Sequence, residues 1–246
     1  MDFEQHIYGM SEEGEAAIIY ILRADNGAEL RLSNYGASII GLKIPNKEGR
    51  LEEIIDSPAN FEAMLRDREY TGRSIDWSVG LRREGIHNTM WESRFETNRV
   101  VMSHEVDGVE IEAIFDFDDE ISLEVTYMAR GEEYSNIDIA PNLLFLLPKD
   151  GGHLQINSSE LRPLDELCPR RGEVDFVKEG HQNGILAPIA LLRGDGNQME
   201  ILTSKDGINL YMCGDSVAIT PRALTAQTTK GGELYCQKMV YKFSTY

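Results

Sequence analysis

Histidine is the side chain best suited to move a proton at neutral pH, and this chain has five of them. They are spread along the sequence, at His6, His87, His104, His153 and His181. No two have the spacing of metal ligands, and the chain has no His-Glu-x-x-His motif. A glycine-rich dinucleotide loop, a phosphate loop and a Gly-x-Ser-x-Gly nucleophile turn are also absent. We therefore expect no metal and no cofactor.

Carboxylates are too numerous here to mark a site by composition alone. Asp and Glu number 42 against 24 Lys and Arg, which gives a net charge of −18. Most of them fall at turns or at alternate strand positions, as solvated faces require. Such an acidic surface repels nucleic acids and anionic lipids, whereas it neither attracts nor repels a neutral ligand such as a free sugar. We expect no nucleic-acid partner and no membrane partner.

The three cysteines, Cys168, Cys213 and Cys236, are odd in number and far apart, with no Cys-x-x-Cys pair. This pattern favours free thiols in a reducing compartment over a disulfide framework or a zinc site. The N-terminus lacks a basic region followed by an apolar run, and no segment reaches the roughly 18 apolar residues of a membrane span. A cytoplasmic location is the resulting prediction.

The elements that must position any site are predicted to be strands. Turn signals recur about every ten residues, with alternating segments between them, which is typical of an antiparallel β protein. Asp25-Asn26-Gly27 and Asp107-Gly108 suit tight hairpins. In the segment 121–127, Ile, Leu, Val and Tyr side chains share one face and polar side chains the other, as in a half-buried strand.

Two segments depart from this alternation. A short helix is expected at residues 60–68. The run 139–147 is apolar on both faces, which predicts a central strand with an edge or bulge at Pro141. We expect an all-β fold, a large and mostly antiparallel β-sandwich, in a single domain spanning residues 1–246.

A collinear set of short motifs resembles the aldose 1-epimerase (galactose mutarotase-like) family. The first runs from Ala28 to Gly49, with Asn34-Tyr35-Gly36-Ala37 between two strands. The others are Tyr70-Thr71-Gly72-Arg73, Ile86-His87-Asn88 with Trp91-Glu92, Leu154 to Glu166, Met199 to Tyr211, and Gly232 to Phe243. The resemblance covers most of the chain. It implies a galactose mutarotase-like supersandwich in a divergent and shortened member of the family.

The resemblance also implies a chemistry, in which a histidine acid and a glutamate base open the ring of an aldose. In the matching segment, Asn142 stands at the position of the histidine, and an amide cannot donate a proton at neutral pH. Thr225 stands at the position of the glutamate. Asp76-Trp77 replaces the family's Asn-Arg, and the loop after His87 is shortened. These departures predict an aldose 1-epimerase-like carbohydrate-binding protein that lacks the usual acid–base pair.

The predicted ligand is a small-molecule sugar. Its predicted binding residues are Arg73, Asp76, Trp77, His87 and Asn142. Trp77 is the candidate platform for the apolar face of a sugar, whereas Trp91 is expected in the core. The remaining candidates for catalysis are His87 and Glu233.

Two alternatives stay open. In the first, an active aldose 1-epimerase or sugar isomerase uses non-standard residues, with His87 or His181 as the acid and Glu233 or Asp215 as the base. In the second, the chain is an assembly or regulatory β-sandwich without catalysis or ligand.

Overall fold

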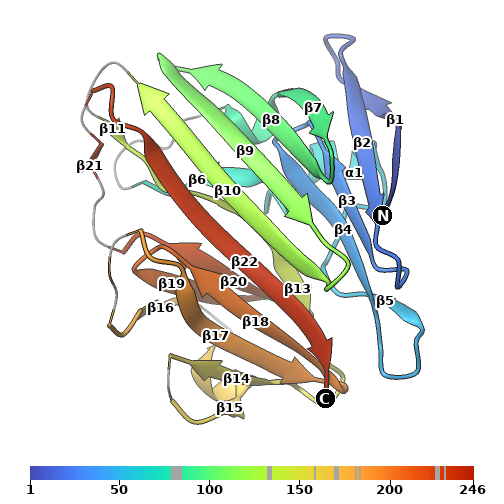
Figure 1. Ribbon diagram of the computed structural model, residues 1–246, viewed down its shortest axis with the longest axis vertical. Coiled ribbons are helices and arrows are strands. Elements are labelled where there is room, and N and C mark those ends of the chain that lie inside the picture. The colour runs from blue at the N-terminus through green and yellow to red at the C-terminus, as the bar shows by residue number, and fades with distance from the viewer. Residues whose placement is uncertain are drawn as a thin grey trace.

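The computed structural model describes residues 1–78, 85–131, 135–157, 159–168, 172–180, 182, 184–224, 228–229 and 231–246. Its elements are almost all strands, arranged in antiparallel sheets (Figure 1). The all-β, mostly antiparallel sandwich predicted from the turn pattern is confirmed. None of the helices in the described ranges is long and apolar enough to cross a membrane.

The N-terminal part of the chain forms a five-stranded meander. Its strands, in order across the sheet, are β1 (Asp2–Met10), β2 (Ala16–Arg23), β3 (Glu29–Ser33), β4 (Ser38–Pro45) and β5 (Leu51–Glu53). The predicted hairpin between β2 and β3 is present, because Gly27 has a positive φ of 89° and donates its N–H to the carbonyl of Ala24. Only glycine adopts that conformation without strain.

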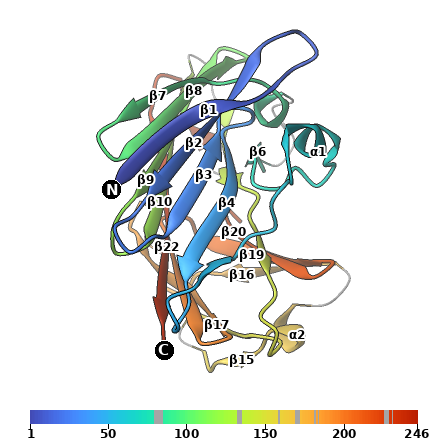
Figure 2. The same cartoon turned by 90° about the vertical axis from the view of Figure 1, so that its right-hand side faces the viewer.

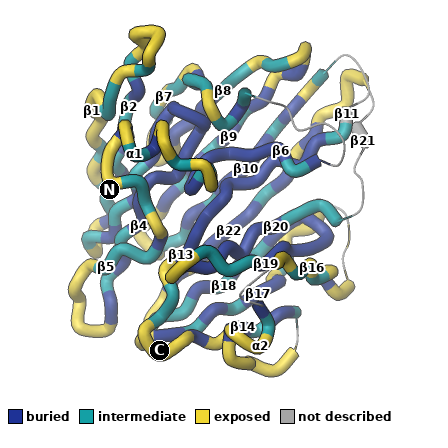
Figure 3. The backbone as a smooth tube through the Cα atoms, turned by 180° about the vertical axis from the view of Figure 1, so that it is seen from behind, coloured by how far each residue is buried: buried dark blue, intermediate teal, exposed yellow. Residues whose placement is uncertain are grey.

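The central layer is a nine-stranded sheet. Its strands, in order across the sheet, are β15 (Arg162–Pro163), β14 (His153–Ile156), β17 (Ala187–Gly194), β18 (Asn197–Thr203), β22 (Tyr235–Thr245), β10 (Ser122–Gly131), β9 (Val109–Phe117), β8 (Arg99–Val106) and β7 (Glu92–Glu96). In β10, Leu123, Val125 and Tyr127 are fully buried, which confirms the predicted inward face. Ile121 lies in the preceding turn and packs against the same core. Figure 3 shows β9, β10 and β22 buried along much of their length.

A third layer is made of shorter strands. One sheet has the order β13 (Leu144–Leu146), β20 (Ser216–Arg222), β19 (Gly207–Cys213) and β16 (Glu173–Val177). Two small pairs join β12 (Ile139–Pro141) with β6 (Ser74–Asp76), and β11 (Ser135–Asn136) with β21 (Thr228–Thr229).

The prediction of one central strand over 139–147 is wrong. The run is split into β12 and β13 at Asn142 and Leu143, because Asn142 leaves the sheet and pairs with another loop. Its N–H donates to the carbonyl of Arg73, and its own carbonyl accepts from the N–H of Gly72. The run is buried from Ile139 to Phe145, as predicted, whereas Leu146 is exposed, and the run belongs to two different sheets.

The predicted helix is α1 (Phe61–Arg66), and its first turn is capped by the side chain of Asn60. Phe61 and Met64 of α1 pack against the outer side of the meander, in a small core with Ala17, Tyr35 and Ile40 (Figure 2). The sequence patterns did not reveal the short α2 (Leu164–Leu167) or the 3₁₀ turn η1 (Ile86–Asn88). Both are too short to show a helical periodicity.

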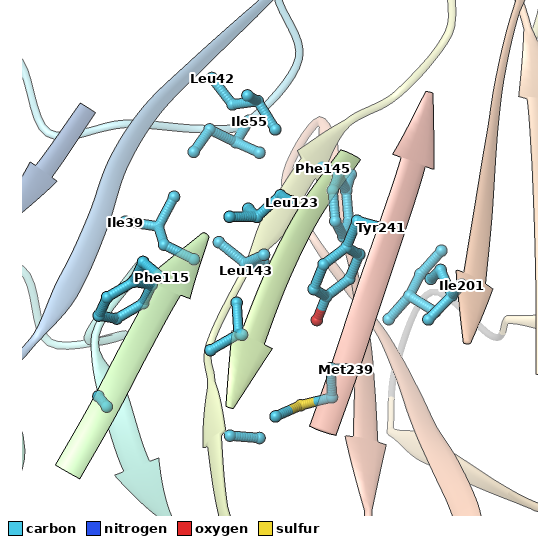
Figure 4. Close-up of a cluster of buried hydrophobic side chains, with 14 of the residues drawn as sticks. Ile39, Leu42, Ile55, Phe115, Leu123, Leu143, Phe145, Ile201, Met239 and Tyr241 are labelled. Atoms are coloured by element: carbon cyan, nitrogen blue, oxygen red, sulfur yellow. The ribbon is translucent and has the colours of Figure 1, made fainter. Parts of the chain in front are cut away.

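All three layers contribute to one large hydrophobic core. The same buried cluster contains Leu42 of the meander, Phe115 and Tyr241 of the nine-stranded sheet, and Phe145 of β13 (Figure 4). The rings of Phe145 and Tyr241 lie 5.9 Å apart. Trp91 is buried in this core, as predicted.

The buried tyrosines make the stability of the fold sensitive to alkaline pH. Burial raises the pKa of Tyr127, Tyr235 and Tyr241 above the usual value of 10. Above pH 10 the unfolded chain therefore releases protons that the folded protein retains, so the free energy of unfolding decreases with rising pH. Tyrosinate absorbance should show a late-titrating group of tyrosines in the folded protein and none in guanidinium chloride. Titration of all ten tyrosines at the usual pH in the folded state would contradict this.

Candidate functional site

A cavity of about 390 Å³ opens where β6, η1, β16 and β19 approach one another. The loop before β6 contributes Arg68, Glu69 and Tyr70, and β6 with its following residue contributes Ile75, Asp76 and Trp77. His87 comes from η1, and Asn142 from the junction of β12 and β13. The lining is completed by Gly172 and Glu173 at β16 and by Tyr211 and Met212 of β19. Aromatic rings, carboxylates, an imidazole and an amide thus surround one space.

Asn142 lines this cavity and is 1% exposed. Its Nδ2 donates to the carbonyl of Glu69 at 2.6 Å, and its Oδ1 accepts from the hydroxyl of Tyr211 at 3.3 Å. Burial raises the pKa of Tyr211 to about 12, so its hydroxyl stays protonated and remains a donor. The Asn142 side chain therefore holds the loop at residues 69–73 in place, and carries no acidic proton.

His87 lines the same cavity and is half-buried, with the centre of its ring 4.3 Å from that of Tyr70. The loop that carries it is fixed on both sides. The N–H of Gly36 donates to the carbonyl of Thr89 at 2.8 Å, and the indole N–H of Trp91 donates to the carbonyl of Ile86 at 2.8 Å. These backbone contacts leave the imidazole at the cavity surface while the rest of the loop is tied to the core.

Arg73 lies behind His87 rather than in the cavity. It is 1% exposed, and its guanidinium donates to the carbonyls of His87 and Met64 and to the side chain of Asn88. The rings of Tyr35 and Tyr70 lie 5.3 and 5.4 Å from the guanidinium carbon. Desolvation lowers the pKa of Arg73, and the aromatic faces offset part of that cost. Its position makes Arg73 a support for the His87 loop.

A cluster of charged side chains lies next to Trp77. The ammonium of Lys205, which is fully buried, donates to Asp138 Oδ1 at 2.7 Å and to the carbonyl of Ile139 at 2.7 Å. Asp138 Oδ2 accepts from Arg222 Nε at 3.2 Å. The Arg222 guanidinium carbon lies 4.7 Å from the centre of the Trp77 ring, and Arg222 also donates to the carbonyl of Trp77.

Asp76 connects this cluster to the cavity. Its Oδ1 accepts from the N–H of Ser78 at 3.0 Å and from the N–H of Asp138 at 3.2 Å. Desolvation lowers the pKa of Lys205, and the negative charges of Asp138 and Asp76 counteract this. Trp77 is half-buried, and its indole Nε1 has no hydrogen-bond partner among the described residues.

The structure thus brings together Asp76, Trp77, His87 and Asn142 of the five predicted sugar-binding residues, and places Arg73 directly behind them. Glu233 and Asp215 are exposed and are not part of the cavity lining. His181 and Thr225 lie outside the described residues.

The sequence patterns did not identify Glu69, Tyr70, Glu173 and Tyr211 as site residues. Tyr70 and Tyr211 belong to the motifs that carried the family resemblance, so the signal for them was present in the sequence. Glu69 and Glu173 had no such signal, because carboxylates in this chain are abundant. Among the described residues, no group of three or more His, Cys, Asp or Glu side chains is placed to hold a metal ion.

Compared by sequence, the chain matches no family model and no curated protein. Compared by structure, it is similar to galactose 1-epimerase from Lactobacillus acidophilus, with a TM-score of 0.80 and 15% identity over 99% of each chain. It is also similar to an aldose epimerase homologue from C. elegans, with a TM-score of 0.75 and 15% identity over 92% of this chain and 98% of that one. A putative aldose 1-epimerase from Escherichia coli gives a TM-score of 0.70 and 12% identity, over 94% of this chain and all of that one.

These similarities show that the chain has the galactose mutarotase-like β-sandwich fold along nearly its whole length. The resemblance found in the sequence motifs is therefore confirmed at the level of the fold.

The ionic cluster beneath Trp77 yields a stability prediction. Replacing Asp138 with Ala should leave Lys205 buried without its counter-ion, at a cost of about 3–5 kcal/mol. Urea unfolding should show this loss. The matched control is Glu124→Ala, which removes the partner of Lys238 in a partly exposed ion pair and should cost less than about 1 kcal/mol. Equal losses in the two variants would contradict the prediction.

Proposed function

We propose that this protein binds a neutral sugar in the cavity between β6, η1 and β19, and that it lacks the usual acid–base pair of aldose 1-epimerases. The observation that supports this most directly is that residues from separate segments of the chain line the same cavity. Asp76, Trp77, His87 and Asn142 come from three separate segments, and they line one cavity whose volume lies in the range of about 300–1,000 Å³ typical of small-molecule sites.

The lining suits the two faces of a sugar ring. Trp77, Tyr70 and Tyr211 offer aromatic surface to C–H groups. The carboxylates of Glu69, Asp76 and Glu173 offer acceptor oxygens to hydroxyl groups, and His87 offers a ring nitrogen. A polar rim around an aromatic wall is the arrangement that orients a small, uncharged, hydroxyl-rich ligand.

The amide at position 142 supports binding without ordinary mutarotation. Both ends of the Asn142 side chain are engaged, with Glu69 and with Tyr211. Transfer of a proton to the ring oxygen of a sugar needs an acid at this point, and an amide cannot supply it.

Binding can be tested with a panel of free aldoses. A sugar at 100 times its Kd should stabilise the folded protein by about 2.7 kcal/mol in a thermal or urea unfolding experiment. Trp77→Ala should weaken binding by up to about tenfold, the factor that corresponds to 1.4 kcal/mol, because stacking is lost. His87→Ala should weaken binding by a similar factor, while His153→Ala, at the exposed first position of β14, should leave it unchanged.

Two results would contradict the proposal of a sugar site. One is the absence of stabilisation by every aldose in the panel, which would favour an assembly or regulatory β-sandwich. The other is sugar binding that is insensitive to the changes at Trp77 and His87.

A second candidate function is epimerisation by non-standard residues, and the cavity lining favours a specific version of it. His87 shares the cavity with Asp76 and Glu173, whereas Glu233 and Asp215 do not line it. In that mechanism a carboxylate takes the proton of the anomeric hydroxyl and protonated His87 gives a proton to the ring oxygen. The C1–O5 bond breaks, a carbonyl forms, and closure on the other face restores both protons.

Saturation-exchange NMR between the α and β anomers separates the two functions. The main proposal predicts an exchange rate equal to that in buffer alone. General acid–base catalysis would instead raise it by about 10²–10⁴-fold for each contributing group. A rate increase that is lost in both His87→Ala and Glu173→Gln, with sugar binding retained in Glu173→Gln, would establish the second function and overturn the first.

A further inference from the structure

The meander ends in a long strand with one open edge. β1 is the end strand of the five-stranded sheet, and among the described residues it pairs with β2 alone (Figure 1). It has nine residues, whereas the other end strands of the three large sheets, β5, β7, β13, β15 and β16, have two to five. Proteins commonly keep edge strands short, because free N–H and C=O groups on an edge can pair with another chain. The length of β1 makes it a candidate interaction surface.

The hydrogen bonds of β2 show which backbone groups of β1 point outward. Ile18 on β2 directs its N–H and its C=O toward Asn34, away from β1, and lies opposite Ile7. Successive residues of an antiparallel strand direct these groups alternately to one side and the other. The N–H and C=O groups of Phe3, Gln5 and Ile7 therefore face the open edge.

The side chains along this edge form two chemically different rows. Phe3 and Ile7 lie on the face of β1 that is turned toward the nine-stranded sheet, since the ring of Phe3 stacks on Phe95 of β7 with 3.6 Å between the ring centres. Ile7 is nevertheless 70% exposed. Asp2 and Glu4 are exposed on the opposite face. A strand added here would place one row of its side chains beside Ile7 and the other beside the two carboxylates.

The regular part of the edge is limited to residues 2–7. The register of β1 against β2 shifts between Ile7 and Gly9, where the strand is bulged. Bulges and charged side chains are the features by which edge strands avoid pairing with copies of themselves. The same features leave residues 2–7 open to a strand of complementary charge.

The charge of the β1–β2 hairpin selects the partner. Side chains of residues 1–23 include five carboxylates and one arginine. Pairing of two copies through β1 would bring these carboxylates together, in a chain whose net charge is −18. Glu4 accepts from Arg23 at 2.6 Å and from His6 at 3.2 Å, and a carboxylate has further lone pairs for a lysine or arginine.

We propose that β1 binds an extended, basic segment of another protein, which adds a strand to the meander. Its apolar side chains lie beside Ile7 and its basic side chains beside Asp2 and Glu4. No residue of β1 lines the cavity that contains Trp77 and His87, so this surface is independent of sugar binding.

The blocked peptide Lys-Val-Lys-Val-Lys-Val-Lys is a suitable probe, because it has the alternation that the edge requires. It should bind with one equivalent per chain and shift the backbone amide resonances of Phe3, Gln5 and Ile7. The peptide with glutamate in place of each lysine should bind at least about tenfold more weakly. Equal binding of the two peptides, or shifts confined to other parts of the chain, would overturn the proposal.

A proline at position 5 tests the edge itself. The N–H of Gln5 points away from β2, so Gln5→Pro removes no bond of the β1–β2 ladder and places its ring on the open edge. Gln5→Pro should bind the lysine peptide at least about tenfold more weakly than the wild type. The matched control Gln5→Thr keeps the N–H and should bind like the wild type. Equal binding by the two variants would overturn the proposal.

Amide hydrogen exchange on the wild type decides the matter if Gln5→Pro does not fold. The lysine peptide should slow exchange at the N–H groups of Phe3, Gln5 and Ile7 by about tenfold or more, because each becomes hydrogen-bonded. Unchanged exchange at all three groups under saturating peptide would overturn the proposal.

Sedimentation measurements distinguish a partner protein from a second copy. The proposal predicts that the wild type and Gln5→Pro have the same molecular mass in solution. A wild-type dimer that dissociates in Gln5→Pro but persists in Gln5→Thr would assign the edge to a second copy of this chain and overturn the proposal.

Discussion

The candidate site depends on a close crossing of backbones at residue 36. Gly36 has a positive φ of 67°, and a Cβ atom there would lie 2.6 Å from the carbonyl oxygen of His87. The N–H of Gly36 donates to Thr89, and its carbonyl accepts from Ser74. The meander thus touches the His87 loop on one side and β6 on the other. Any side chain at this position would push the two walls of the cavity apart, so the Asn34-Tyr35-Gly36-Ala37 stretch acts on the site through its backbone.

Buried cations lie next to the cavity lining at two places, near His87 and near Trp77. Arg73 is held by carbonyls and by two tyrosine rings, and it fixes the loop that presents His87. The Asp138 carboxylate joins Lys205 and Arg222, and Arg222 lies against Trp77. Such groups are costly to bury and contribute little to stability unless every hydrogen bond is made. Their shared effect is to hold an imidazole and an indole in fixed positions at the cavity surface, which reduces the side-chain ordering that a ligand would otherwise have to impose.

Sequence reasoning predicted most strands, the helix α1, the hairpins at Gly27 and Gly108, and the approximate membership of the site. These features follow from local rules, because positive φ at glycine and a two-residue alternation are visible in a few residues. The rules failed at 139–147, where the apolar run is buried as far as Phe145, as expected, but forms two strands instead of one. The pairing of Asn142 with residues 72–73, about seventy positions earlier, divides the run, and no local pattern reports that contact. The carboxylates Glu69 and Glu173 were missed because acidic residues are abundant in this chain and nothing local distinguishes these two.

The sequence by itself determined the β class of the chain and its acidic character, and it indicated Trp77, His87 and Asn142 as candidate sugar-binding residues. It also shows that residue 142 is an asparagine, whose amide cannot donate a proton at neutral pH in any fold. Only the tertiary structure decided which side chains share a cavity, that Arg73 stands behind His87, and that Glu233 and Asp215 face solvent. The physical reason is that side-chain chemistry is encoded residue by residue, whereas burial, pairing and enclosed volume arise from contacts between segments far apart in the chain.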